Sequence, residues 1–172
     1  ISKYIDNIVL DKNDNGKLIS LIEFDNKKYI LKKIINNDQT LINMLRNETV
    51  ILNKLKYANV TPKLYNYSFT ENNHYIIIEL IKGRTLNNLN IKGWKERVSL
   101  MLKITAAVRK IHSLGIIHCD LKPDNIIVDT DNNIKLIDFG IAINNDKHYF
   151  KGYGNINYCS RSQALKERID FD

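Results

Sequence analysis

The first three apolar stretches of this 172-residue chain are separated by very short connections. These stretches, residues 4–10, 17–24 and 27–34, are rich in Ile and Leu, and residues 11–16 and the pair Asp25-Asn26 between them are typical turn formers. Parallel neighbours need a crossover of about a dozen residues, whereas antiparallel strands can be joined by a two-residue turn. The spacing therefore predicts an antiparallel meander.

A helix and two further strands follow the meander. Residues 37–56 place Leu41, Met44 and Leu45 at helical spacing, followed by Leu52 and Leu55. Asp38 and Thr40 are both candidates for the N-cap, and Pro62 ends the pattern. Strands are expected over residues 64–69 and 74–80, with a joint at Lys82-Gly83. The first half is thus expected to be one sheet with one helix.

The second half is expected to be mainly helical. Residues 94–114 form a helical pattern that Gly115 stops. Its apolar residues, on one broad face, are Val98, Met101, Leu102, Ile104, Ala107, Val108 and Ile111. A short hairpin is predicted from residues 126–128 and 134–137 around residues 129–133. Beyond Gly140 the pattern indicates a loop, with a short helical stretch near residues 163–168. The predicted fold class is α+β.

Composition excludes several classes of protein. The longest uninterrupted apolar run is four residues, and there are only two cysteines, so no membrane-spanning helix, disulfide framework or multi-cysteine zinc site is expected. The net charge is +7, but the basic residues are scattered. The chain has 27 Ile, 23 Asn and 20 Lys, all with AT-rich codons, so a genome of biased composition could supply the lysines without selection for phosphate binding. We expect a cytoplasmic protein that does not bind nucleic acid or a membrane.

The hairpin brings chemically useful side chains together. Pairing its strands places Asn125, just before the first strand, beside Asp138, just after the second. Amide and carboxylate oxygens suit Mg²⁺ that arrives on the phosphates of a nucleotide. Asp120 can accept the proton of an attacking hydroxyl, and Lys122 can stabilise negative charge on a transferred phosphoryl group. The pattern predicts phosphoryl transfer.

Residues 118–125 (HCDLKPDN) and 138–140 (DFG) resemble, in order and spacing, the catalytic loop and Asp-Phe-Gly motif of the protein kinase family. The alternative, a polar helix-to-hairpin turn that contains these residues by chance, does not account for two motifs at the right separation. The resemblance implies a sheet-rich N-lobe with the hinge in residues 1–82. It also implies a partial C-lobe in residues 83–172, with the catalytic loop, the Asp-Phe-Gly motif and the activation segment.

The family implies a role for each matching residue. It assigns the catalytic base to Asp120, charge stabilisation to Lys122, and Mg²⁺ to Asn125 and Asp138. The residues implied to bind ATP are Lys32 and its ion-pair partner Glu48, Ile30 above the adenine, the hinge residues Glu79 and Ile81, the floor residues Ile127 and Ile137, and the roof residues Leu10 and Leu18. Lys122 favours a Ser/Thr protein substrate over a Tyr substrate.

Several positions depart from the family pattern. In the phosphate loop only Gly16 remains of the aligned glycines, and the carboxylates of Asp11 and Asp14 would repel phosphate if they faced it. The same stretch is similar to a calcium loop, but its twelfth position is Ile22 instead of Glu, and calcium is rejected. Cys119 replaces the arginine that usually engages a phosphorylated activation loop, which implies activity without that switch. Residues 160–162 (SRS) stand where Ala-Pro-Glu is expected.

The length leaves two alternatives to an active protein kinase. The chain ends where the central helix of the larger lobe is expected, so we expect a truncated sequence, or a partner that covers the apolar surface left open. A pseudokinase acting as a binding module would explain the lost glycines, although Lys32, Asp120, Asn125 and Asp138 are all retained. A small-molecule kinase of the antibiotic phosphotransferase type is the other alternative, but those enzymes seldom contain the Lys122-Pro123 step.

Overall fold

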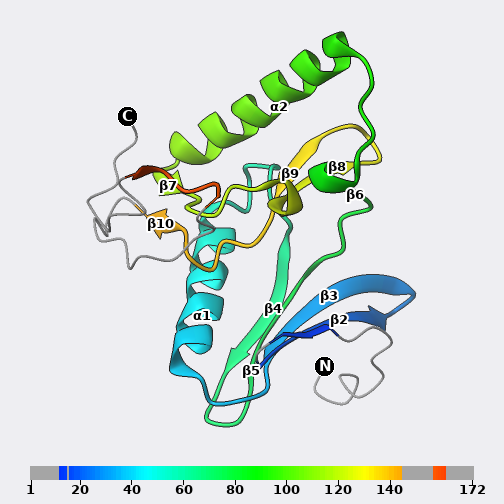
Figure 1. Cartoon of the computed structure of the whole chain (residues 1–172). Coiled ribbons are helices and arrows are strands. Elements are labelled where there is room, and N and C mark those ends of the chain that lie inside the picture. The colour runs from blue at the N-terminus through cyan, green and yellow to red at the C-terminus, as the bar shows by residue number, and fades with distance from the viewer. Residues whose placement is uncertain (1–11, 15, 145–156, 162–172) are drawn as a thin grey trace.

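The computed structural model describes residues 12–14, 16–144 and 157–161 (Figure 1). A five-stranded antiparallel sheet and helix α1 form one part of the molecule, and helix α2 with a short hairpin forms the other. The bounds are β1 Lys12–Asp14, β2 Lys17–Phe24, β3 Lys27–Ile34, α1 Gln39–Lys54, β4 Leu64–Phe69, β5 His74–Glu79, β6 Gly83–Thr85, α2 Trp94–His112, β7 Ile116–Ile117, β8 Ile126–Asp129, β9 Ile134–Leu136 and β10 Ile143–Asn144. The α+β class predicted from the sequence is confirmed.

The sheet has the order β1-β2-β3-β5-β4. Strands β2 and β3 have the predicted bounds and are joined by Asp25 and Asn26, which both have positive φ. Asp and Asn tolerate this conformation, and such a two-residue turn matches the twist of the strands it joins. The predicted strand over residues 4–10 lies outside the described residues. Strand β1 lies within the stretch predicted as a turn, so that part of the prediction is wrong.

Helix α1 begins after Asp38, whose side chain accepts hydrogen bonds from the backbone N–H groups of Thr40 and Leu41 at 2.8 and 3.2 Å. This cap satisfies two donors that a helix start leaves free. The helix packs against β4 and β5 and runs along one side of the sheet (Figure 1). Its buried residues are Ile42, Leu45, Glu48, Thr49, Ile51 and Leu52.

Helix α2 buries only part of its apolar arc. Leu100, Ala107 and Ile111 are buried, while Val98, Met101 and Leu102 are exposed. The broad face predicted from the sequence is therefore divided into a covered stripe and an open stripe. This agrees with the expectation of uncovered apolar surface; what covers it stays a prediction. Neither α1 nor α2, nor any other described helix, combines the length and apolar character needed to cross a bilayer.

The hairpin β8–β9 connects the two parts of the molecule. The N–H of Leu136 donates to the carbonyl of Val60 at 2.8 Å, and the N–H of Thr130 donates to the carbonyl of Lys82 at 2.9 Å. Strand β6 pairs with β8 on the other edge of the hairpin. These bonds fix the hairpin against both the end of α1 and the segment that links the two parts.

Beyond Gly140 the chain is not entirely loop. Strand β10 pairs with β7, with Ile143 opposite Ile117, which corrects the expectation of a loop there. The helical stretch predicted near residues 163–168 lies outside the described residues. Ile117 and Ile143 thus connect the segment after Asp138 to the segment that precedes Asp120.

One large hydrophobic core runs through both parts. It contains Leu52 of α1, Ile76 of β5, Ile111 of α2, Leu136 of β9 and the fully buried Phe139. A second, small cluster of Ile22, Leu31 and Ile77 covers the other face of the sheet. The residues before and after the hairpin are therefore held by the main core.

Candidate active site

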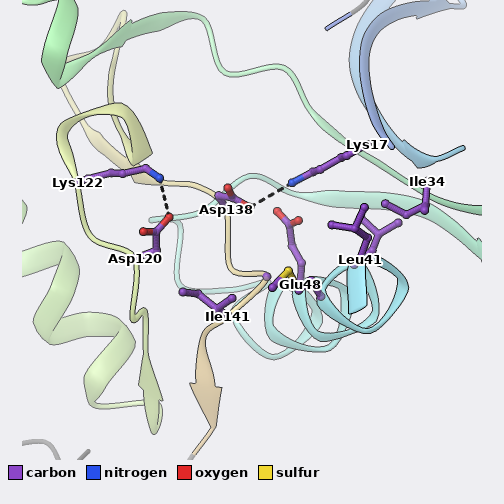
Figure 2. A pocket seen from close by; sticks show the side chains of 11 residues that line it. Lys17, Ile34, Leu41, Glu48, Asp120, Lys122, Asp138 and Ile141 are labelled. Carbon is purple, nitrogen blue, oxygen red and sulfur yellow. Dashed lines mark ion pairs between the residues drawn. The ribbon is translucent and has the colours of Figure 1, made fainter. Parts of the chain in front are cut away.

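A pocket of about 410 Å³ lies between α1, the start of β2 and the loops that flank the hairpin (Figure 2). Its lining residues are Lys17, Ile34, Leu41, Met44, Leu45, Glu48, Asp120, Lys122, Asp138, Gly140 and Ile141. Figure 2 shows Lys17 and Lys122 pointing toward the carboxylates of Asp138 and Asp120 from opposite sides. Three segments far apart in the sequence thus bring both lysines and carboxylates to one pocket.

We define the interlobe cluster as Lys17, Lys32, Glu48 and Asp138. Lys17, Glu48 and Asp138 line one side of the pocket, and Lys32 contacts Glu48 and Asp138 without lining it. The buried ammonium of Lys32 donates to Glu48 Oε1 at 2.5 Å and lies 3.7 Å from Asp138 Oδ1. Lys17 Nζ lies 3.6 Å from the same oxygen of Asp138. The pairing of Lys32 with Glu48 that the family resemblance implied is therefore present, together with a second lysine that it did not imply.

The charges of this cluster reinforce one another. Burial alone would lower the pKa of Lys32, but the carboxylates of Glu48 and Asp138 outweigh it, and the pKa lies above its usual value. The ammonium of Lys32, followed by that of Lys17, lowers the pKa of Asp138 to about 2 against the opposing effect of burial. Both groups are ionised at neutral pH, so the pocket holds an Asp138 carboxylate ready to bind a cation.

We define the loop cluster as Asp120, Lys122 and Asn125. Asp120 and Lys122 line the other side of the pocket, and Asn125 contacts Asp120. Lys122 Nζ lies 2.9 Å from Asp120 Oδ2, and this contact raises the pKa of Lys122. The side-chain amide of Asn125 donates to Asp120 Oδ2 at 2.8 Å and to the backbone carbonyl of Asp120 at 2.9 Å. Two donors therefore fix the Asp120 carboxylate.

His118 sets the backbone between the two clusters. Its Nδ1 accepts from the N–H of Asp120 at 3.3 Å, which leaves Nε2 as the donor to the carbonyl of Ile137 at 3.0 Å. Burial lowers the pKa of His118, and the ring packs on Phe139 with a centroid distance of 4.6 Å. A neutral imidazole thus connects the segment before Asp120 to the segment before Asp138.

Two residues of these segments have left-handed backbone conformations. Asp138 has φ +67° and Cys119 has φ +64°, a region that non-glycine residues seldom occupy. The Cys119 thiol is buried, and burial raises its pKa to about 12. Such local strain is tolerated where the surrounding contacts fix the chain, as His118 and Phe139 do at this position.

Asn47 connects α1 to the chain that follows Asp138. Its side-chain amide donates to three backbone carbonyls, those of Phe139, Gly140 and Ala142, at 3.2, 3.1 and 2.8 Å. Asn47 is the neighbour of Glu48 in α1, so the helix that presents Glu48 to Lys32 also binds the segment after Asp138. Sequence reasoning did not identify Asn47 as a residue that supports the site.

The donor set fits Mg²⁺ bound together with phosphate. Asp138 presents an ionised carboxylate to the pocket, and the amide nitrogen of Asn125 is used by Asp120, which leaves the Asn125 oxygen for a cation. The N–H of Ile137 donates to the Asn125 carbonyl at 3.0 Å, so the two segments meet as predicted, although the Asn125 side chain turns toward Asp120. Within the described part of the chain no three His, Cys, Asp or Glu residues cluster as a metal site. Two oxygen ligands with phosphate completing the shell suit Mg²⁺.

Those residues implied to bind adenine that the structure describes do not line this pocket. Ile30 shares the Lys32 face of the sheet, opposite Ile78. The N–H of Glu79 donates to the carbonyl of Lys63 at 2.8 Å, and Ile81 is half-buried.

Ile127 and Ile137 are half-buried outside the main core, whereas their hairpin neighbours Ile126 and Leu136 pack within it. Their position is compatible with the floor of a neighbouring adenine site. That role, like those of Ile30, Glu79 and Ile81, stays a prediction.

One roof residue is misplaced in the sequence prediction. Leu18 pairs with Lys33, while Ile19 pairs with Lys32. Residues directly opposite in a sheet share a face, so Leu18 lies on the face away from Lys32, and the prediction for Leu18 is wrong. Ile19 takes the corresponding place. Leu10, the other predicted roof residue, lies outside the described residues.

Comparison with known proteins identifies similar chains. Residues 9–162 match the protein kinase domain family. The probable serine/threonine-protein kinase fnkE of Dictyostelium discoideum is 38% identical over 166 residues, 88% of this chain and 12% of that protein. The serine/threonine-protein kinase mph1 of Schizosaccharomyces pombe is 34% identical over 167 residues, 88% of this chain and 24% of that protein.

A third relative, the dual specificity protein kinase zakA of Dictyostelium discoideum, is 33% identical over 134 residues, 74% of this chain and 16% of that protein. The chain spans between 12% and 24% of the length of these three relatives.

Proposed function

The chain belongs to the protein kinase domain family, and from this premise we propose that it transfers the γ-phosphoryl group of Mg-ATP to a serine or threonine hydroxyl of a protein. The observation that carries the proposal is that members of both clusters line one pocket: Lys17, Glu48 and Asp138 of the interlobe cluster, and Asp120 and Lys122 of the loop cluster. One cluster provides lysines and a carboxylate for a polyphosphate, and the other provides a carboxylate for the acceptor.

The loop cluster is suited to activate the acceptor. The Asp120 carboxylate, held by Lys122 and Asn125, accepts the hydroxyl proton as the acceptor oxygen attacks the γ-phosphorus. The bond from the γ-phosphorus to the bridging oxygen breaks, and ADP leaves with the electron pair. Lys122 stays an ammonium because its pKa is raised, and it stabilises the charge on the phosphoryl oxygens.

The interlobe cluster is suited to position the nucleotide. Lys32, oriented by Glu48, binds phosphate oxygens, and Asp138 with Asn125 would hold Mg²⁺. When bound there, Mg²⁺ would neutralise negative charge on the phosphates. Catalysis then consists mainly of positioning the reactants and of electrostatic stabilisation of the transition state.

The test is transfer of label from [γ-³²P]ATP to a generic protein substrate, with the Asp138→Ala variant in parallel. We expect label on serine or threonine from the unsubstituted chain and loss of label from the variant. Phosphoamino-acid analysis separates serine and threonine from tyrosine, which matters because zakA is named a dual specificity kinase.

Two other functions are outcomes of the same assay. Equal label with both proteins would contradict the proposal, and ATP binding without transfer would favour a pseudokinase. Label on a small molecule alone would favour the antibiotic-type kinase. A cytoplasmic location stays a prediction, which cell fractionation would test.

A further inference from the structure

Lys17 is placed in the pocket by the register of the sheet. Lys17 pairs with Ile34, and Ile19 pairs with Lys32, so Lys17 lies on the same face as Lys32. At this end of the hairpin the N–H of Ile35 donates to the carbonyl of Gly16 at 3.0 Å. Gly16 has φ +94°, and a Cβ there would lie 2.2 Å from the Asn36 amide nitrogen. The backbone before Lys17 is therefore fixed to the end of β3.

The charge around Lys17 differs from that around Lys32. Lys32 is shared between Glu48 and Asp138 and is buried, whereas the Lys17 side chain is a quarter exposed and its ammonium approaches Asp138 alone among the carboxylates of the described chain. A partly exposed ammonium that borders the pocket can turn to a ligand without leaving a buried partner uncompensated. Lys17 is thus the more available of the two lysines.

The ligand that fits this arrangement is a polyphosphate. Two ammonium groups lie within 4 Å of one oxygen of Asp138, the residue that would carry the cation shared with the phosphates. Lysine binds phosphate as a strong, charge-assisted donor. The stretch before Lys17 keeps one glycine of the phosphate loop. Side chains in place of the other glycines hinder close approach of the backbone to phosphate, so a side-chain cation can make the contact instead.

We propose that Lys17 binds the polyphosphate of the nucleotide together with Lys32, and so replaces the missing glycines of the phosphate loop. The inference rests on the proposed function, because it concerns the same nucleotide site. It assigns Lys17 to the phosphates and not to the adenosine.

The experiment measures dissociation constants of Mg-ATP, Mg-ADP and adenosine by calorimetry for the unsubstituted chain and for Lys17→Met, Lys17→Arg and Lys27→Met. Lys27 is the matched control because it is exposed at the turn end of the same hairpin. We expect Lys17→Met to weaken Mg-ATP about tenfold, the loss expected for one hydrogen bond to a charged group, and to leave adenosine within about twofold. Lys17→Arg keeps the charge and retains Mg-ATP affinity within about threefold, and Lys27→Met matches the unsubstituted chain.

Two results would overturn the inference alone: wild-type Mg-ATP affinity in Lys17→Met, or equal weakening of adenosine and Mg-ATP. Thermal unfolding of each variant shows whether it is folded. If Lys17→Met is misfolded, the comparison of Lys17→Arg with the unsubstituted chain decides. More than tenfold weaker Mg-ATP binding by Lys17→Arg, which keeps the charge, would contradict a charge-based role. If the unsubstituted chain binds no Mg-ATP, the proposed function fails, and this inference fails with it.

Discussion

The two clusters that face each other across the pocket are built in different ways. The loop cluster comes from six consecutive residues, and its contacts join Asp120 to Lys122 and Asn125 within one loop. The interlobe cluster joins β2, β3, α1 and the segment after β9, so each of its ion pairs depends on the placement of distant elements. The loop cluster therefore depends on local sequence, and the interlobe cluster depends on the tertiary packing of the whole fold.

This difference predicts which substitutions change the rate of the reaction without changing the stability of the fold. A substitution in the loop cluster removes a reacting group while the core stays packed. A substitution in the interlobe cluster changes the contacts that hold α1, the sheet and the hairpin together, because Lys32 and Glu48 are buried between them. Substitutions in the loop cluster should therefore lower the transfer rate with little change in the free energy of unfolding. Substitutions in the interlobe cluster should lower both.

The largest effect is expected for Asp120→Asn. Loss of the proton acceptor should lower the transfer rate about 10³-fold, whereas the free energy of unfolding should change by less than about 1 kcal/mol because the amide has the same shape. Initial rates and urea unfolding measure the two quantities. Asp124→Asn, in the same loop and exposed, is the control and should keep its rate. Equal rate losses in the two variants would contradict the assignment of the base.

For Glu48→Gln we expect a large loss of stability, in contrast to Asp120→Asn. The variant leaves the buried Lys32 ammonium with Asp138 alone, and loss of one partner of a buried ion pair costs about 3 kcal/mol of unfolding free energy. Urea unfolding measures this cost, with Glu23→Gln on exposed β2 surface as the matched control. Lys122→Met, in the more exposed pair, should cost less than about 1 kcal/mol. A Glu48→Gln protein as stable as Glu23→Gln would remove the distinction between the clusters.

Asn47→Ala tests the connection between α1 and the segment after Asp138. Three carbonyls lose their shared donor, so we expect about 1–2 kcal/mol lower unfolding free energy and a transfer rate reduced about tenfold. Asn43→Ala on the same helix is the control, because Asn43 is exposed and its side chain accepts a hydrogen bond from Gln39. The interpretation would be wrong if the two variants had the same rate.

His118 gives the smallest effect, a dependence of stability on pH. Burial lowers its pKa in the folded chain below the ordinary 6.5, so the unfolded chain binds a proton that the folded chain does not. Stability should therefore fall below about pH 6.5. His118 contributes at most one proton to the slope, about 1.4 kcal/mol per pH unit, and His112, whose pKa is also lowered by burial, adds to it. Asp138, with a pKa of about 2, titrates below this window.

Urea unfolding between pH 5 and about 8 measures the slope. His118→Gln, which keeps a neutral donor for the Ile137 carbonyl, should show a smaller slope than the unsubstituted chain. An unchanged slope would mean that His118 is not the titrating group.

The difference between the local loop cluster and the long-range interlobe cluster also explains which parts of the site the sequence predicts well. The loop cluster is predictable because Asp120, Lys122 and Asn125 are close in sequence and the hairpin fixes where they lie. The pair of Lys32 and Glu48 was reached only through the family resemblance, since its contact depends on how α1 lies against the sheet. Nothing local to Glu48 distinguishes it from a solvated helix residue.

Three shortfalls of the sequence prediction have identifiable causes. Counting outward from the two-residue turn Asp25-Asn26 places Ile19 and Lys17 on the face of Lys32 and Leu18 on the other, so the register carried a signal that alignment with the family hid. On α2 the apolar spacing gave a broad arc but could not tell which stripe is covered, because that depends on neighbours. Asn47 had no sequence signal, since its three acceptors lie in an irregular segment.

The buried thiol of Cys119, beside the Asp120 carboxylate, has a consequence for chemical probes. With a pKa of about 12, Cys119 holds only about one thiolate in 10⁵ molecules at neutral pH, and the thiolate is the form that reacts with electrophiles. An acrylamide or chloroacetamide warhead aimed into this pocket should therefore leave Cys119 unmodified, even though the residue is the immediate neighbour of Asp120.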